Sequence, residues 1–215
     1  MVSARVRWVA IGLVLAATII VPFLLFGDAL EAAVVQWLET GPSMAAIVAV
    51  VVVVLASDVL LPVPSSIVAT AAGALLGFGL GTAANTVGLM LGAGVGYGIG
   101  AAGRGAAERV VGAAELRSAQ ALFERRGDIV VATLRPIPVL AELSVVFAGV
   151  TAMPRGKFAL YTGLANLGIG AAYAGLGAWA VEADSMLVAV AASLALPGVA
   201  MLIGRQLSRA DGPAA

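Results

Sequence analysis

Long apolar stretches without charge dominate this chain of 215 residues. A transmembrane helix needs about 20 mostly apolar residues to cross the hydrocarbon core of a bilayer. Four charge-free stretches meet this requirement: Trp8–Phe26, Gly77–Gly103, Phe158–Val181 and Met186–Gly204. The pattern therefore predicts an all-α integral membrane protein with about four full transmembrane helices.

Two further apolar stretches, Met44–Gly73 and Ile129–Thr151, are interrupted by ionisable residues and prolines. The interrupting residues are Asp58, Pro62, Pro64, Arg135, Pro136, Pro138 and Glu142. Each Pro-x-Pro pair removes two backbone donors and disfavours helix in the residue before it, so we expect the helix to break there. Ser65 and Ser66 could complete a polar turn at the first break; a simple helix kink is the alternative.

Two amphipathic segments separate these stretches. Residues 28–41 open with the capping-box-like pair Asp28 and Glu31 and place apolar residues on one face, which predicts an interfacial helix. The segment Arg104–Arg126 mixes charges of both signs with apolar positions. It predicts a solvated connecting helix, with a partner-binding helix as the alternative.

The basic residues set the expected orientation, because cytoplasmic loops are enriched in Lys and Arg. Asp28–Thr40 and Glu182–Asp184 contain neither, so we place them outside and both termini in the cytoplasm. Each interrupted stretch must then enter and leave by the same face, as a re-entrant hairpin at about 44–76 or 128–152. Of the twelve basic residues, only Arg135 then remains within the membrane.

The two predicted hairpins resemble each other and enter from opposite faces. Each has a Pro-x-Pro motif, an Ala-Gly pair and a following apolar helix with an asparagine. The matching positions are Pro62-Val63-Pro64 and Pro136-Ile137-Pro138, Ala72-Gly73 and Ala148-Gly149, and Asn85 and Asn166. This pattern predicts an inverted-topology repeat, a common plan of transporters. Chance similarity in an Ala- and Val-rich chain is the alternative.

The predicted core comprises residues 42–181. Residues 1–27 are expected to form an N-terminal transmembrane helix, and residues 182–215 a C-terminal transmembrane helix with a short cytoplasmic tail. We interpret the first helix as retained rather than as a signal peptide. Its apolar run exceeds an h-region of about 7–15 residues, and no A-x-A-like cleavage site follows it before Asp28.

Composition excludes several classes of protein and site. The chain is 61% hydrophobic and 11% charged, whereas soluble domains are about 45–50% apolar and about 25% charged. It has no cysteine and no histidine, which removes disulfides, Cys or His metal sites and His catalysis. The net charge of zero gives no field for nucleic acid. We find no catalytic constellation and expect no enzyme activity, cofactor or metal.

Three ionisable residues inside the predicted hairpins are the candidate chemistry: Asp58, Arg135 and Glu142. A charge at the bilayer centre costs at least about 2.5–3.5 kcal/mol on insertion scales, and such groups face cavities or pair with one another. One interpretation is a structural ion pair. The other is a water-accessible pocket in which Arg135 binds an anion such as a phosphate head group and a carboxylate exchanges a proton.

One helix face of the stretch Gly77–Gly103 carries a glycine at every fourth position: Gly88, Gly92, Gly96 and Gly100. Small residues at this spacing allow helices to approach closely within a membrane. We therefore expect this face to pack against other helices.

Taken in order, these motifs resemble the DedA family, also called VTT-domain or SNARE-associated membrane proteins, and within it the members with a PVPSS-type motif. The matching positions are Asp58 to Ser66, Gly73, Gly77, Asn85, Gly88, Gly96-Tyr97, Gly103-Arg104, Phe123, Gly127, Arg135, Pro138, Ala148-Gly149, Met153 and Phe158. The resemblance implies two opposed re-entrant hairpins, transport of phospholipids or lipid-linked carriers, and dependence on the proton-motive force. It assigns Asp58 and Arg135 to the functional centre.

The chain departs from the family pattern in two places. Ser66 stands where a second acid often follows the first Pro-x-Pro-Ser motif, and a second arginine after the second hairpin's proline is missing. Both departures bear on proton coupling and head-group preference.

We therefore predict a flippase- or scramblase-like translocator of phospholipid or lipid-linked carrier in the cell membrane, supporting membrane homeostasis, with proton coupling left open. Its expected partners are the bilayer and anionic lipid head groups, and not nucleic acid; a homo-oligomer is left open. The alternatives are a transporter of small solutes or ions and a non-transporting membrane scaffold.

Overall fold

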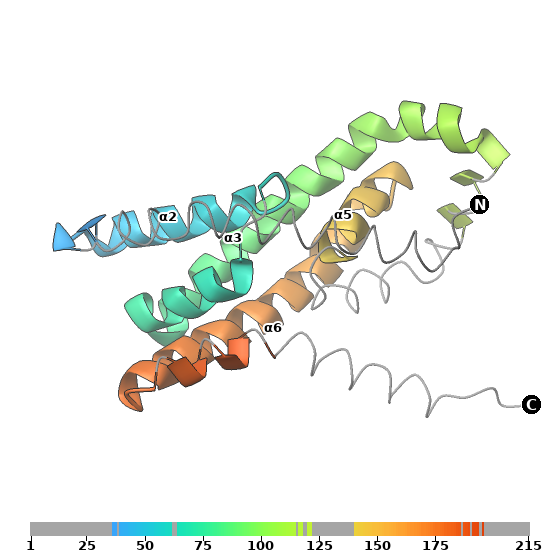
Figure 1. Ribbon diagram of the computed structural model, residues 1–215. Coiled ribbons are helices and arrows are strands. Elements are labelled where there is room, and N and C mark those ends of the chain that lie inside the picture. Colours follow the sequence, from blue (N-terminus) through green and yellow to red (C-terminus); the bar gives the residue numbers. More distant parts are fainter. Residues whose placement is uncertain are drawn as a thin grey trace, which may run out of the picture.

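The structure, a computed structural model, is entirely helical in its regular elements. It describes residues 36–37, 39–61, 64–114, 116–117, 120–121, 140–185, 187–189, 191–193 and 195, and none of these forms a strand. The main helices are α2 (Met44–Ser57), α3 (Ser65–Val111), α5 (Leu140–Val150) and α6 (Arg155–Glu182), drawn in Figure 1. The predicted all-α class is confirmed.

The first of these helices, α2, is bounded by local polar contacts. Gly41 has a φ of 65°, which is unfavourable for other residues, and Pro42 follows it. The Ser43 hydroxyl then accepts a hydrogen bond from the Ala46 N–H at 3.3 Å and caps the helix. α2 ends at Ser57 after 14 residues, too short to cross a bilayer at about 1.5 Å per residue.

A sharp break at Gly77 divides α3 into two segments, 65–76 and 78–111. Its φ of 74° and ψ of 173° belong to a region that is essentially restricted to glycine. The chain folds back there. This is shown by the hydrogen bond that the Asn85 side-chain amide donates to the Ala69 carbonyl at 2.9 Å. A Cβ on Gly81 would likewise lie 3.0 Å from the Ala72 carbonyl oxygen. The two segments of α3 therefore form an antiparallel pair.

The second segment of α3 is longer than the sequence predicted. It continues past Gly103 to Val111 and ends at Gly112, whose φ is 103°. The residues from Arg104 to Val111 therefore extend α3 and do not form a separate connecting helix. Nothing between Gly103 and Gly112 is a proline, and the alanines there favour helix.

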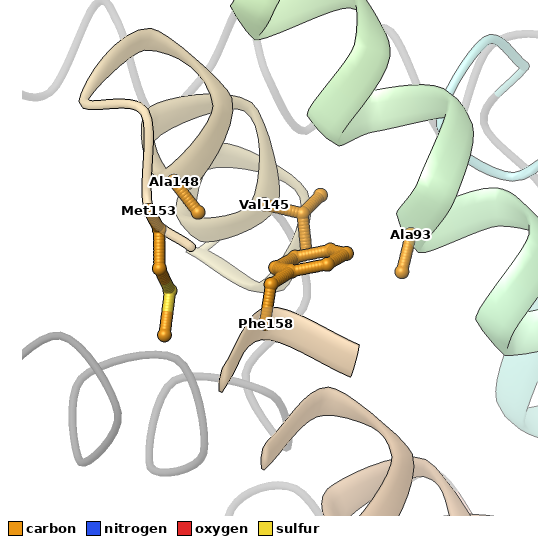
Figure 2. Packing of buried hydrophobic residues seen from close by; sticks show 5 residues of the cluster. All are labelled: Ala93, Val145, Ala148, Met153 and Phe158. Atoms are coloured by element: carbon orange, nitrogen blue, oxygen red, sulfur yellow. The ribbon is translucent and has the colours of Figure 1, made fainter. Parts of the chain in front are cut away.

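Two apolar clusters hold the helices together. The first joins α2 to both segments of α3 through Val51, Leu55, Ala72, Leu76 and Ala84. The second joins α3, α5 and α6 through Ala93, Val145, Ala148, Met153 and Phe158. Figure 2 shows Phe158 and Val145 side by side and directed toward Ala93. The clusters therefore lie at successive positions along α3.

A tyrosine reinforces the second cluster. The Tyr97 ring lies 4.6 Å from the Phe158 ring, centroid to centroid, and its hydroxyl donates to the Met153 carbonyl at 2.7 Å. The turn between α5 and α6 is thereby fixed to α3.

Helices α3 and α6 pack along each other and form the body of the molecule. Figure 1 shows the start of α2, the bend of α3 and the end of α6 at one end of the bundle, with the end of α3 at the other. By length and composition, Ser65–Arg109 and Arg155–Glu182 are long and apolar enough to cross a membrane; in the former, the part after the bend at Gly77 is the continuous helix. Of the other two predicted spans, Trp8–Phe26 lies outside the described residues and Met186–Gly204 is described only in part.

Candidate functional site

The four glycines spaced by four on α3, which we call the glycine row, pack against α2 and α5. A Cβ added to Gly88 would lie 2.8 Å from the Leu55 Cβ. A Cβ on Gly92 would lie 3.0 Å from the Leu55 carbonyl oxygen. Because both distances are shorter than normal carbon contacts, α2 packs directly on the first half of the row.

The second half of the glycine row lies against α5. A Cβ on Gly96 would lie 2.6 Å from Val145 Cγ2, and a Cβ on Gly100 would overlap the Val146 carbonyl oxygen. Gly96 also faces Val59, the second residue after α2, whose Cγ1 would be 3.5 Å away. The turn after α2 and the helix α5 therefore meet at Gly96, about midway along the second segment of α3.

Two of the three predicted ionisable residues lie close to this meeting point in the chain. Asp58 caps the C-terminus of α2 and directly precedes Val59. Glu142 lies in the first turn of α5, three residues before Val145. Both side chains are half-buried, and the Glu142 Oε2 atom is fully buried. Arg135 lies outside the described residues.

The first Pro-x-Pro motif coincides with an interruption between helices. α2 ends at Ser57 and α3 begins at Ser65, with Pro64 as its N-cap. No side chain caps this end of α3, and both Ser65 and Ser66 are half-buried in its first turn. The remaining motif prolines, Pro62, Pro136 and Pro138, lie outside the described residues.

The two Ala-Gly pairs that match in sequence make reciprocal contacts. A Cβ on Gly73 would lie 2.5 Å from the Ala174 Cα of α6, and a Cβ on Gly149 would lie 2.7 Å from the Ala101 N of α3. The preceding alanines, Ala72 and Ala148, are both 0% exposed. Each pair thus packs against the long helix that follows the other pair.

Comparison with protein-family models matches the VTT domain to residues 63–179. The match covers more than half of the 215 residues. This chain belongs to the VTT-domain family. The VTT domain is the domain of the DedA family, so the resemblance to that family is confirmed. No curated protein and no solved structure gives a significant match.

The VTT domain and the two long apolar helices point to a membrane protein, as the sequence predicted. Exposed apolar side chains on successive turns of α3 agree with this: Val87, Leu91, Val95 and Ile99. In water such a stripe would be unfavourable, whereas lipid chains solvate it. Proteins of this family are often linked to transport or membrane homeostasis.

A buried asparagine of the VTT domain has a structural role that the sequence did not reveal. Asn85 is 0% exposed, and its side-chain nitrogen donates to the Ala69 carbonyl at 2.9 Å and the Gly170 carbonyl at 3.3 Å. It thereby links both segments of α3 to α6. Gly170 has no side chain, so the asparagine can approach; a Cβ there would lie 3.1 Å from the Asn85 Cβ.

Two polar residues of α6 were also missed as candidates. Thr162 and Asn166 are 0% and 1% exposed, one helical turn apart. The sequence signals were a threonine and an asparagine inside an apolar helix, where polar groups need partners, and the match of Asn166 with Asn85 in the predicted repeat.

Proposed function

We propose that this VTT-domain protein translocates phospholipid or a lipid-linked carrier across the bilayer, in the manner of a flippase or scramblase. The observation that carries the proposal is the meeting of Val59 and Val145 at Gly96. This contact supports an arrangement in which two hairpins enter the membrane from opposite faces and meet near its middle, as in transporters built from inverted repeats. The reciprocal packing of the two Ala-Gly pairs supports the same plan.

In this proposal the polar groups at the meeting point form the path for the lipid head group. Asp58 and Glu142 lie beside the hairpin contact, and Arg135 stands on the second hairpin by sequence. A guanidinium binds phosphate through two parallel hydrogen bonds, so Arg135 would contact the head group. The acyl chains would stay among the exposed apolar side chains of α3 and α6. No covalent step is needed, so we propose a translocator and not an enzyme.

The membrane orientation is tested by cysteine labelling, for which the chain offers a background free of cysteine. Single cysteines at Glu39 and Asp184, both exposed, should react in intact cells with a reagent that cannot cross the membrane. A cysteine at Arg117, also exposed, should react only after permeabilisation. External labelling of position 117 would contradict the orientation and the re-entrant hairpins with it.

Transport is tested by a head-group-resolved flip-flop assay on purified protein in vesicles, with and without a pH gradient. We expect Arg135→Lys to slow lipid movement by about tenfold or more, because it loses a charge-assisted hydrogen bond of about 1.5–3 kcal/mol. Asp58→Asn should abolish any response to the pH gradient. The matched controls are Arg155→Lys and Asp184→Asn, at exposed positions outside the meeting point; both should transport normally.

Three outcomes would contradict the proposal. Full transport by the double variant Asp58→Asn with Arg135→Gln would mean that the two charges form only a structural ion pair. Uptake of a soluble solute or ion without movement of lipid would favour a transporter of small solutes. If neutralised variants keep their cellular function and the protein moves neither substrate, a membrane scaffold is the better description.

A further inference from the structure

Three buried polar side chains lie on α3 and α6, which pack along each other. Thr162, Asn166 and Gly170 recur every fourth residue and so lie on one face of α6. Asn85 of α3 lies against Gly170, to whose carbonyl it donates. Asn166 is one helical turn from Gly170, a rise of about 6 Å, and Thr162 is one turn further. The polar groups therefore form a short line inside an otherwise apolar interface.

Within the described part of the chain, each of these residues has a fully buried polar atom without a hydrogen-bond partner. The atoms are the Asn85 Oδ1, the Thr162 hydroxyl and the Asn166 Nδ2. Leaving a buried donor or acceptor unpaired costs the full desolvation free energy of that group, so native structures rarely do so. Three such atoms along one line point to small polar partners within this interface.

The Thr162 hydroxyl is the most informative of the three. The other five described threonines all donate to a carbonyl three or four residues earlier in the chain. These are Thr40, Thr70, Thr82, Thr86 and Thr151. A helical threonine makes this bond readily, so its absence at Thr162 indicates a hydroxyl directed toward something else.

We propose that Asn85, Thr162 and Asn166 hold ordered water between α3 and α6. The three unpaired atoms are an acceptor, a hydroxyl and a donor, and a water molecule can donate to the first and accept from the last. Buried waters typically make about three hydrogen bonds to groups of this kind. A bare cation fits less well, because the Asn166 amide hydrogens would repel it. This site is independent of the proposed lipid translocation.

Nuclear magnetic resonance can detect this water directly, because Asn85 and Asn166 are the only asparagines in the chain. Selective ¹⁵N-asparagine labelling of the full chain in lipid bilayers gives two side-chain amides. We expect magnetisation transfer from water to the Asn166 amide, weakened in Thr162→Val. Absence of transfer in the wild-type protein would overturn the proposal.

Thermal stability gives a second test whose sign depends on the water. Thr162→Val keeps the side-chain shape but removes a water ligand, so the apparent Tm should fall by about 2–4 °C, as for one lost hydrogen bond in a chain of this size. Without water the same change removes an unpaired hydroxyl, and an unchanged or raised Tm would overturn the proposal.

Three controls complete this test. Thr70→Val should leave the Tm nearly unchanged, because the buried Thr70 hydroxyl bonds only to the Ser66 carbonyl of its own helix. Thr162→Ser keeps the hydroxyl and should retain the water signal at Asn166. The Tm in sodium chloride should equal the Tm in choline chloride. A higher Tm in sodium chloride alone would indicate that a cation occupies the site and would overturn the proposal of water.

Discussion

Gly100→Leu should prevent stable packing of α5 on α3, whereas Gly98→Leu, two residues away on the same helix, should leave the protein folded. A Cβ on Gly100 would overlap the Val146 carbonyl oxygen and lie 3.0 Å from the Val150 N. These are backbone atoms, which cannot rotate away as a side chain can. Gly98 is exposed and has no atom within 4 Å of its added Cβ.

The size of the effect follows from the atoms that must move. Overpacking usually costs about 1–3 kcal/mol, and we place Gly100→Leu at or above the top of that range. Gly96→Leu should cost less, because it meets the Val145 side chain. Thermal melting and gel filtration in detergent provide the readout. If Gly98→Leu and Gly100→Leu melt at the same temperature, the glycine row is not an internal contact.

Asn85→Asp should destabilise the protein by about 3–5 kcal/mol, the cost of leaving a charge unpaired in a protein interior. The substitution keeps the side-chain shape but replaces the donating amide with a carboxylate. The Ala69 and Gly170 carbonyl oxygens, which now accept from Asn85, would then face a negative group. The two hydrogen bonds would thus become two repulsive contacts at Asn85, a residue that is 0% exposed.

A comparison with Asn85→Leu separates electrostatics from packing in this prediction. Leucine loses both hydrogen bonds but brings no charge into the interface. The expected order of apparent Tm is therefore wild type, then Asn85→Leu, then Asn85→Asp. If leucine proves as harmful as aspartate, steric fit at Gly170 dominates and the asparagine is not primarily a donor between helices.

Much of the helix pattern could be predicted because it depends on local signals. The predicted span Phe158–Val181 corresponds to α6, Arg155–Glu182, because its apolar stretch covers most of the helix; the helix starts three residues earlier, directly after Pro154. The predicted end of the first re-entrant hairpin, at about residue 76, falls beside the break at Gly77, where only glycine suits the backbone. The end of α3 at Val111 was missed, because neither the charges nor Gly105 end the helix before Gly112.

The contacts that build the site could be predicted much less well. Asn85 bonds to carbonyls that lie 16 and 85 positions away in the chain, and no local pattern encodes such pairs. The glycine row indicated a helix contact but not which helices make it. The meeting of Val59 and Val145 at Gly96 has no sequence signature, because small apolar residues are common throughout this chain.

The uncapped start of α3 has an electrostatic consequence. Its N-cap residue is Pro64, whose side chain makes no capping hydrogen bond. A helix carries a partial charge of roughly +0.5 at its N-terminus. The dipole of α3 thus contributes a positive potential on the side of the first predicted hairpin.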